Sequence, residues 1–429
     1  MIEFKKTPRF YFVISVLMFV FGLGPLFLNI IVDPYEVGNI VKIDLEKEKI
    51  SEKSHYPLWK MVHYPSEKSN LVILGDSRAR ALRDKYWQEL GVDGAYNFAY
   101  GGATLHEVYD TFQYVKTNKN LRTLVVGIQL RSFDLDHKGG MNRVPEAIRL
   151  TSSSLKYYSN WFTSRISVKL LANSFEDRFK VSTKLDLSLV STAQAAEPPF
   201  SEKGRLEQLL LPERCANCIL PQEIQATPYP VYTPISKSHF LTQLGKWGKF
   251  WHASVSRRNL TGKFERQVRK NAASDWQSFE AADLFWSQLS EISIWCRQNN
   301  VDLIFVIPPT IVEMQQRIAE FGLGAERHNL RKRLVSLGTV VDFDFDNKLT
   351  RNLANFTDAY HFNYKISKQI VGELAQLSEP SERVLNLALK RRKEISCPLR
   401  KKDVLTRFSD DFMEVLEGKS CRIWRAIDE

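Results

Sequence analysis

Five short runs of apolar and β-branched residues recur along the chain, and each is followed by a stretch with helical spacing. The runs cover residues 71–74, 95–98, 123–128, 303–307 and 340–345. Short runs without polar alternation are typical of strands that are buried on both faces of a parallel sheet. Strands that alternate with helices favour crossovers that place helices on both faces. We therefore predict an α/β fold, with a three-layer, doubly wound parallel sheet.

A longer apolar segment precedes this pattern. Residues 10–32 contain no charged side chain, and a helix of that length can cross a bilayer. Residues 1–9 include Lys5, Lys6 and Arg9, so the positive-inside rule predicts a cytoplasmic N-terminus and an extracytoplasmic (periplasmic or extracellular) main domain. The alternative is a cleaved signal peptide, whose apolar region would be shorter and would end at a small-residue site. We expect a single-pass membrane protein.

The rest of the chain divides by composition. Residues 33–68 are typical of a polar linker, and residues 69–377 contain the predicted α/β domain. The third and fourth strands are much farther apart than a crossover requires, so we predict a large, mainly helical insertion at about 135–300. An insertion that follows the carboxyl end of a strand lies over the active site, which makes this one a candidate lid or acceptor-binding subdomain. Residues 378–429 form a basic C-terminal extension.

Side chains suited to nucleophilic catalysis follow two of these strands. Ser77 comes after the first strand and a glycine, and we predict a helix over residues 78–90. That serine would lie at the carboxyl edge of the sheet, where α/β folds bind ligands and where the start of a helix favours developing negative charge. A serine needs a base and a group that orients the base, and Asp358 and His361 fit those two roles.

These residues lie in short blocks that resemble those of the SGNH, or GDSL-like, hydrolase superfamily. The four blocks, in chain order, are Gly75-Asp76-Ser77, Asn97 to Gly102, Gly127 to Leu130, and Asp358 to His361. The third block departs from the family pattern of Gly-x-Asn-Asp, because it has Gln129 where the family has asparagine. The resemblance covers about residues 70–377, with the insertion as an interruption. It implies the flavodoxin-like SGNH fold.

The resemblance also implies roles for individual residues. Ser77 would attack an ester carbonyl, His361 would carry the proton, and Asp358 would hold the imidazole in the required tautomer. The backbone amides of Ser77 and Gly102 and the side-chain amide of Gln129 would face the oxyanion. No metal and no cofactor is implied.

Cysteine pairs are consistent with an exported chain. Cys215 and Cys218 form a C-x-x-C motif without the second pair that a zinc site would need, so a local disulfide is expected. Cys397 and Cys421 are a second candidate pair, which leaves Cys296 as a buried thiol.

Several tryptophans fall in the predicted insertion, and either sugar stacking or core packing explains them. Their helical spacing favours the core for most of them. They are Trp247, Trp251, Trp276, Trp286 and Trp295.

The formal net charge of +11 is concentrated near the C-terminus. Residues 383–407 contain nine Lys or Arg and two acidic residues, which is typical either of a solvated helix face or of a surface that binds anionic lipid, acidic polysaccharide or an acidic partner. The predicted extracytoplasmic location disfavours nucleic acid as a partner.

The leading hypothesis is an anchored O-acyltransferase or O-acyl esterase that acts on a cell-envelope polysaccharide. The chain resembles proteins of envelope acetylation systems, which can work beside a multi-spanning membrane acyltransferase that supplies the acyl group. The alternative is a non-catalytic glycan-binding or assembly subunit that partners such an acyltransferase. The altered third block is the main support for that alternative.

Overall fold

The computed structural model describes residues 23–134, 141–187, 262–378, 382–391, 413–418 and 420–426, together with positions 11, 12, 15, 260 and 397. Contacts divide the chain into two units, residues 1–176 with 255–429 and residues 177–254. The elements below belong to the first unit, except for the last turns of helix α8, which belong to the second.

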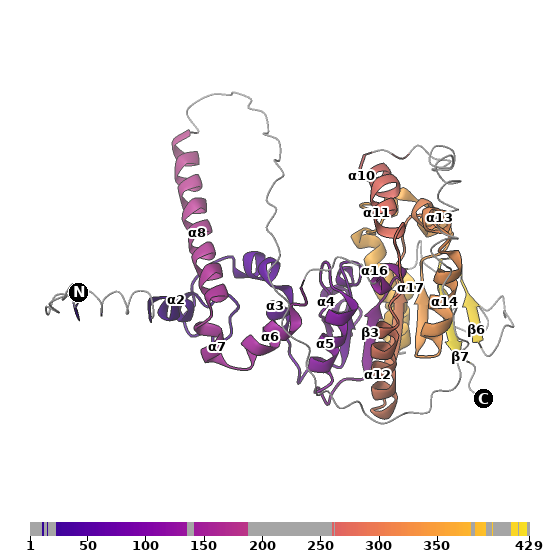
Figure 1. Ribbon diagram of the computed structural model, residues 1–429, viewed down its shortest axis with the longest axis horizontal. Coiled ribbons are helices and arrows are strands. Elements are labelled where there is room, and N and C mark those ends of the chain that lie inside the picture. Colours follow the sequence, from indigo (N-terminus) through magenta and orange to yellow (C-terminus); the bar gives the residue numbers. More distant parts are fainter. Residues whose placement is uncertain are drawn as a thin grey trace, which may run out of the picture. The chain divides into compact units, whose positions relative to one another are not determined.

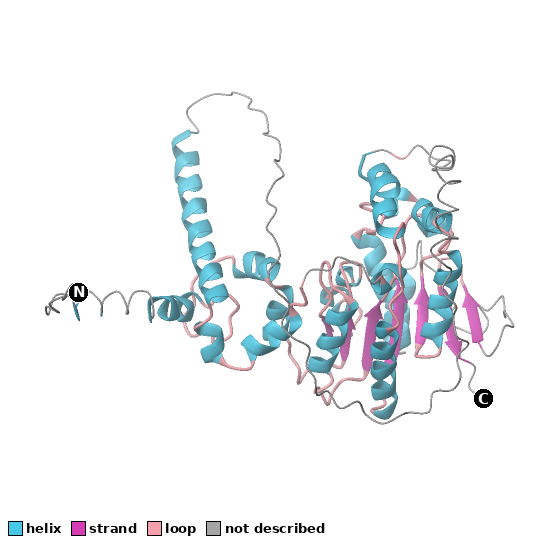
Figure 2. Cartoon of the chain, in the orientation of Figure 1, coloured by secondary structure: helices cyan, strands magenta, loops and turns pink. Residues whose placement is uncertain are grey.

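A single mixed sheet of seven strands forms the centre of the first unit, in the order β2-β1-β3-β4-β5-β7-β6 (Figure 2). The first five strands are parallel, whereas β7 pairs antiparallel with both β5 and β6. The strands are β1 (Leu71–Leu74), β2 (Ala95–Asn97), β3 (Thr123–Gly127), β4 (Asp302–Ile307), β5 (Thr339–Asp342), β6 (Met413–Glu417) and β7 (Arg422–Ala426). The α/β class and the five parallel strands predicted from the apolar runs are therefore confirmed.

Helices pack on both faces of the sheet (Figure 1). On one face, α5 (Leu105–Val115) packs against α12 (Leu284–Gln298). On the same face, α14 (Gly324–Val335) places the Arg333 guanidinium 3.9 Å from the ring centre of Trp286 in α12. On the opposite face, the short helix α4 (Asp84–Gln88) packs against α16 (Tyr364–Ser378), the helix that follows the Asp358–His361 loop.

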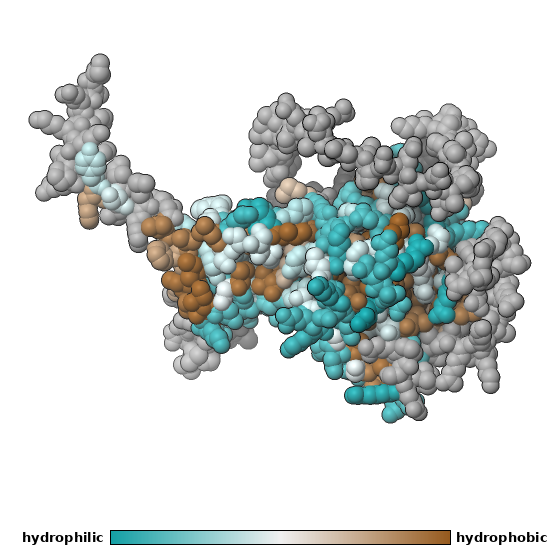
Figure 3. Space-filling view, turned by 90° about the horizontal axis from the view of Figure 1, so that it is seen from below, coloured by the Kyte–Doolittle hydropathy of each residue, from teal (hydrophilic) through white to brown (hydrophobic). Residues whose placement is uncertain are grey.

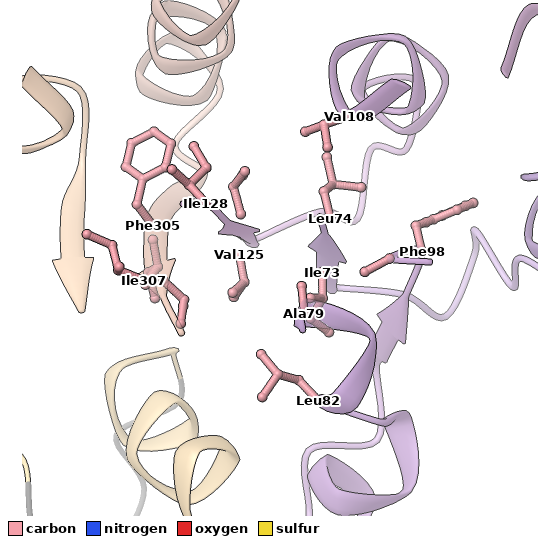
Figure 4. Close-up of a cluster of buried hydrophobic side chains, with 14 of the residues drawn as sticks. Ile73, Leu74, Ala79, Leu82, Phe98, Val108, Val125, Ile128, Phe305 and Ile307 are labelled. Atoms are coloured by element: carbon pink, nitrogen blue, oxygen red, sulfur yellow. The ribbon is translucent and has the colours of Figure 1, made fainter. Parts of the chain in front are cut away.

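The side chains of β1 alternate between these two faces. Figure 4 shows Leu74 directed toward Val108 of α5, whereas Ile73 lies on the side of Ala79 and Leu82. All four residues of β1 are buried, because a parallel strand with helices on both faces has no solvent side.

The remaining elements connect the strands or flank the sheet. The other α-helices are α2 (Gly24–Val32), α3 (Tyr56–Val62), α4 (Asp84–Gln88), α6 (Val144–Thr151), α7 (Ser154–Tyr158), α8 (Trp161–Leu187), α10 (Gly262–Arg266), α11 (Ala272–Trp276), α13 (Val312–Glu320), α15 (Lys348–Arg351), α16 (Tyr364–Ser378) and α17 (Glu382–Arg391). Short 3₁₀ or π turns are η2 (Glu48–Glu52), η3 (Ala79–Ala81), η4 (Leu130–Phe133), η6 (Gln267–Asn271) and η7 (Leu353–Asn355).

The prediction of one helix over residues 78–90 is wrong. The chain instead makes the 3₁₀ turn η3 and then α4, with Arg83 in an extended conformation between them. Asn97 explains the break, because its side-chain amide donates 2.9 Å hydrogen bonds to the carbonyl oxygens of Ala79 and Leu82, which a continuous helix would use itself. The start of a long helix therefore does not face Ser77, and the helix-dipole argument for the site fails.

The segment predicted as a linker, residues 33–68, is folded. It contains η2 and α3, and the side chains of Tyr35 and Leu58 are fully buried. Helix α3 packs against α6. A polar composition hid this segment, although Tyr35, Leu58 and Met61 are buried.

The end of the predicted insertion and the C-terminal extension also differ from the prediction. Helix α12 lies inside the predicted insertion of 135–300, yet it is the crossover helix that leads into β4. The C-terminal extension supplies β6 and β7, and a disulfide joins Cys397 to Cys421 at the turn between these two strands. Charged residues interrupt both strands, so a search for apolar runs did not identify them.

The predicted membrane segment, residues 10–32, is described mainly from Leu23 onward, where it contains α2. Across the described ranges, no helix combines the length and apolar character that a bilayer crossing requires. The membrane crossing therefore remains a prediction.

Candidate functional site

Ser77 lies in a tight turn at the carboxyl end of β1. Gly75, which begins the turn, has a φ of 138°, a conformation that side chains rarely allow. A Cβ atom at Gly75 would lie 2.7 Å from Ala79 Cβ, and one at Gly127, at the end of β3, would lie 2.5 Å from the same atom. The turn thus packs against the end of β3 at a distance that only glycine permits at both positions.

The structure brings Ser77, His361 and Asp358 together although the serine and the histidine are 284 residues apart. His361 Nε2 lies 2.8 Å from Ser77 Oγ. His361 Nδ1 lies 2.9 Å and 3.0 Å from the two carboxylate oxygens of Asp358. The His361 side chain is 40% exposed, so a substrate can reach it from solvent. The arrangement can deprotonate the serine and stabilise the imidazolium that results.

Asp358 is held in its charged form. Burial alone would raise the pKa of this carboxyl, but hydrogen bonds from His361, Lys263 and the Tyr360 backbone amide outweigh burial and lower the pKa well below its usual range. Lys263 Nζ lies 2.7 Å from Asp358 Oδ2. The carboxylate is therefore available to orient His361 across the whole neutral range.

A second segment holds the loop that carries Asp358 and His361. Gln267 Oε1 accepts a 2.8 Å hydrogen bond from the Ala359 amide, and Asp275 accepts a 3.0 Å bond from the Tyr360 hydroxyl. Together with Lys263, these residues contact three consecutive positions of the loop, one after another. We call α10, η6 and α11, residues 262–276, the loop clamp.

The oxyanion donors predicted from the resemblance lie at the same edge of the sheet, after β1, β2 and β3. The loop after β2 is tied to the serine turn by a 3.3 Å hydrogen bond from the Tyr100 amide to the Gly75 carbonyl. Gly102 in that loop has a φ of 70°, and a Cβ there would meet only open space. Gln129 Nε2 donates a short hydrogen bond to Asp76. One of its two amide hydrogens is thus bound to Asp76 and cannot donate to an oxyanion.

Two buried donors line a cavity beside these residues. Arg78 is 3% exposed, and its Nη2 atom has no hydrogen-bond partner in the described part of the structure. Trp276 Nε1 is also buried without a hydrogen-bond partner among the described residues. Both side chains line the cavity together with Gln129 and Tyr360. Either a water molecule or a polar group of a substrate can satisfy such donors.

The tryptophans and cysteines singled out from the sequence lie away from Ser77 and His361 in the chain's core or outside the described residues, apart from Trp276 at the cavity. Trp276 and Trp286 are buried and Trp295 packs at 5.4 Å against Phe112, as core packing predicts. Trp247, Trp251, Cys215 and Cys218 lie outside the described residues. Cys296 is buried, and burial raises the pKa of its thiol to about 12. In the described ranges, no three His, Cys, Asp or Glu side chains gather as a metal site would require.

The loop clamp was not predicted from the sequence. Lys263, Gln267 and Asp275 are common surface residue types and form no recognisable motif. Gln267 lies 92 residues before Ala359, and Asp275 lies 85 residues before Tyr360, so the contacts are not visible in the local sequence. Only their place inside the predicted insertion hinted at a role, because an insertion that follows the carboxyl end of a strand lies over the site.

The chain matches no protein-family model, and no curated protein sequence matches it significantly.

Proposed function

We propose that the chain is an SGNH-type serine enzyme that transfers or hydrolyses O-acyl groups on a cell-envelope polysaccharide. The observation that carries this proposal is the Ser77–His361–Asp358 chain of hydrogen bonds at the carboxyl edge of a parallel sheet. The strand order of the five parallel strands, β2-β1-β3-β4-β5, also fits the flavodoxin-like SGNH fold.

The reaction proceeds through an acyl-serine. Ser77 Oγ attacks the ester carbonyl while His361 Nε2 takes its proton, and the tetrahedral oxyanion forms near the backbone amides of Ser77 and Gly102. His361 then donates the proton to the leaving alcohol, which departs as the acyl-serine forms. A second alcohol or water attacks the acyl-serine in the reverse sense. A sugar hydroxyl gives transfer, and water gives hydrolysis.

The proposed setting is extracytoplasmic, with residues 10–32 as the membrane anchor. A Cys397–Cys421 disulfide supports an oxidising compartment. The acyl donor is supplied from the membrane, by a multi-spanning acyltransferase beside the anchor. The acceptor is an envelope glycan.

A second candidate is a non-catalytic glycan-binding or assembly subunit. The observation that favours it is the engagement of Gln129 by Asp76, because a missing oxyanion donor costs about 10²-fold to 10³-fold in rate. A binding subunit, however, has no need for a serine hydroxyl within hydrogen-bond distance of a carboxylate-oriented histidine.

Fluorophosphonate labelling of the full chain in detergent separates the two candidates. An activated Ser77 forms a covalent adduct that peptide mapping locates, and Ser77→Ala and His361→Ala each abolish it. Ser66→Ala, at an exposed serine in the turn before β1, is the matched control and retains full labelling. Hydrolysis of 4-nitrophenyl acetate should fall by about 10³-fold or more in the first two variants. A folded wild-type chain that stays unlabelled would favour the binding subunit.

A further inference from the structure

Helix α8 exposes a stripe of mostly apolar residues along its first half. Trp161, Arg165, Val168, Ala172 and Phe175 follow one another at intervals of four and three residues, which places them on one face of a helix. All five are exposed, and Trp161, Val168 and Phe175 are exposed by 75%, 55% and 60%. We call these five residues the α8 stripe. The other side of the helix is inside the protein, where Ile166 and Leu170 are fully buried.

The same helix is fastened to the end of the apolar N-terminal segment. Asn29 of α2 is fully buried and donates to the Tyr158 carbonyl at 2.7 Å and to Ser164 Oγ at 2.9 Å. Ser167 Oγ in turn donates to Asn29 Oδ1 at 2.9 Å. Figure 1 shows α7 and the first turns of α8 beside α2, with α8 running crosswise to it.

These hydrogen bonds fix the position along α2 at which α8 crosses it. Asn29 is three residues before Val32, the last residue of α2, so it lies roughly 4.5 Å from the end of that helix. Asp33 caps the helix and accepts a 3.0 Å hydrogen bond from the Tyr157 hydroxyl. A bilayer that contains residues 10–32 would therefore have its outer surface at the level where α8 crosses.

The charge and surface of this region match an anionic bilayer. Residues 153–175 contain no acidic residue, and the basic side chains of Lys156, Arg165 and Lys169 are exposed. Leu23, just before α2, and Ile31 of α2 are also exposed, and Figure 3 shows hydrophobic residues gathered over the α2 end of the described surface. A helix with aromatic and aliphatic residues on one face and flanking lysine and arginine is typical of helices that lie in the membrane interface.

We propose that the α8 stripe lies in the headgroup region of the anionic bilayer that holds residues 10–32, so that the chain has an in-plane contact in addition to its anchor. This proposal rests on the membrane location given under the proposed function. Two observations select the bilayer as the occupant, rather than a second copy of the chain or its residues 188–259. They are the continuity with the apolar segment and the basic charge of residues 153–175.

Photo-crosslinking of the full chain in vesicles of phosphatidylethanolamine and phosphatidylglycerol tests the contact. p-Benzoylphenylalanine in place of Val168 should form lipid adducts at least about fivefold more often than in place of Asn173, an exposed position to one side of the stripe. Arg165→Glu with Lys169→Glu should lower the adduct yield at position 168 by about fivefold or more, because each basic residue near an anionic surface adds about that factor. Crosslinking at position 168 to another copy of the chain, to residues 188–259, or equally at both positions would overturn the proposal.

Fluorophosphonate labelling of the same preparations keeps the two proposals separable. Val168 and Asn173 contact none of the site residues, so both probe variants should label at Ser77 as the wild type does. Normal labelling without lipid adducts rejects the in-plane contact alone. Lipid adducts without labelling reject the serine chemistry alone.

Discussion

The two halves of the candidate site are held in place by different forces. The Gly75–Ser77 turn is fixed by close packing, since Ala79 and Gly127 leave no room for another carbon atom. The Asp358–His361 loop is fixed by polar contacts from Lys263, Gln267 and Asp275 in the loop clamp. Close packing barely yields, whereas partly exposed polar contacts are weaker and depend on salt and pH. Ser77 therefore lies in the rigid half of the site, and His361 lies in the half that other parts of the chain can influence.

The largest effect is expected from the carboxylate that orients the base. Asp358→Asn removes the charge and favours the wrong imidazole tautomer, so hydrolysis of 4-nitrophenyl acetate should fall by about 10³-fold to 10⁴-fold in kcat. Asp346→Asn, which alters an exposed carboxylate paired with Arg351, is the control and should change little. A loss below about tenfold would mean that the loop clamp, rather than Asp358, orients His361.

The close packing around Ser77 is tested by a destabilising substitution and a second substitution that should compensate for it. Gly127→Ala places a Cβ 2.5 Å from Ala79 Cβ, so it should displace the serine turn, destabilise the fold by about 1–3 kcal/mol and lower activity by roughly 10²-fold. Adding Ala79→Gly removes the clash and should restore most of both losses. Thermal unfolding in detergent and ester hydrolysis measure the two effects. If the double variant is no better than the single one, steric packing is not what positions Ser77.

The smallest effect is expected at the loop clamp. Lys263→Met removes a cation 2.7 Å from Asp358, which is one of the contacts that hold the Asp358–His361 loop. We expect kcat/KM to fall by only about threefold to tenfold, because the lysine is half exposed and its ion pair is screened by solvent. Without the hydrogen bond from Lys263 the pKa of Asp358 is lowered less, so on acidification the kcat/KM profile should fall at a higher pH than in the wild type. High salt should reduce the difference between the variant and the wild type.

Two substitutions control for this result. Lys263→Arg keeps the charge and should keep the wild-type profile, and Lys270→Met removes a nearby exposed lysine that does not contact the loop. A profile that moves equally in Lys270→Met would show that general surface charge, not the loop clamp, acts on the base.

The apolar runs were sufficient to predict the five parallel strands and the α/β class, because a strand buried on both faces leaves a run without polar interruption. They were not sufficient for the helix after Ser77, which Asn97 divides by binding the carbonyl groups of Ala79 and Leu82. They also missed β6 and β7, whose burial depends on partners that the local pattern does not reveal.

By itself, the sequence determined the identity and chain order of Ser77, Asp358 and His361, and the strand that leads to the serine. Local residue types carry that information, since a strand followed by Gly-Asp-Ser constrains only its own backbone. The tertiary structure alone decided that His361 Nε2 lies 2.8 Å from Ser77 Oγ, that Gln129 binds Asp76, and that residues 262–276 hold the Asp358–His361 loop. Those contacts join segments between 53 and 284 residues apart, and their geometry follows from how the sheet and its helices pack.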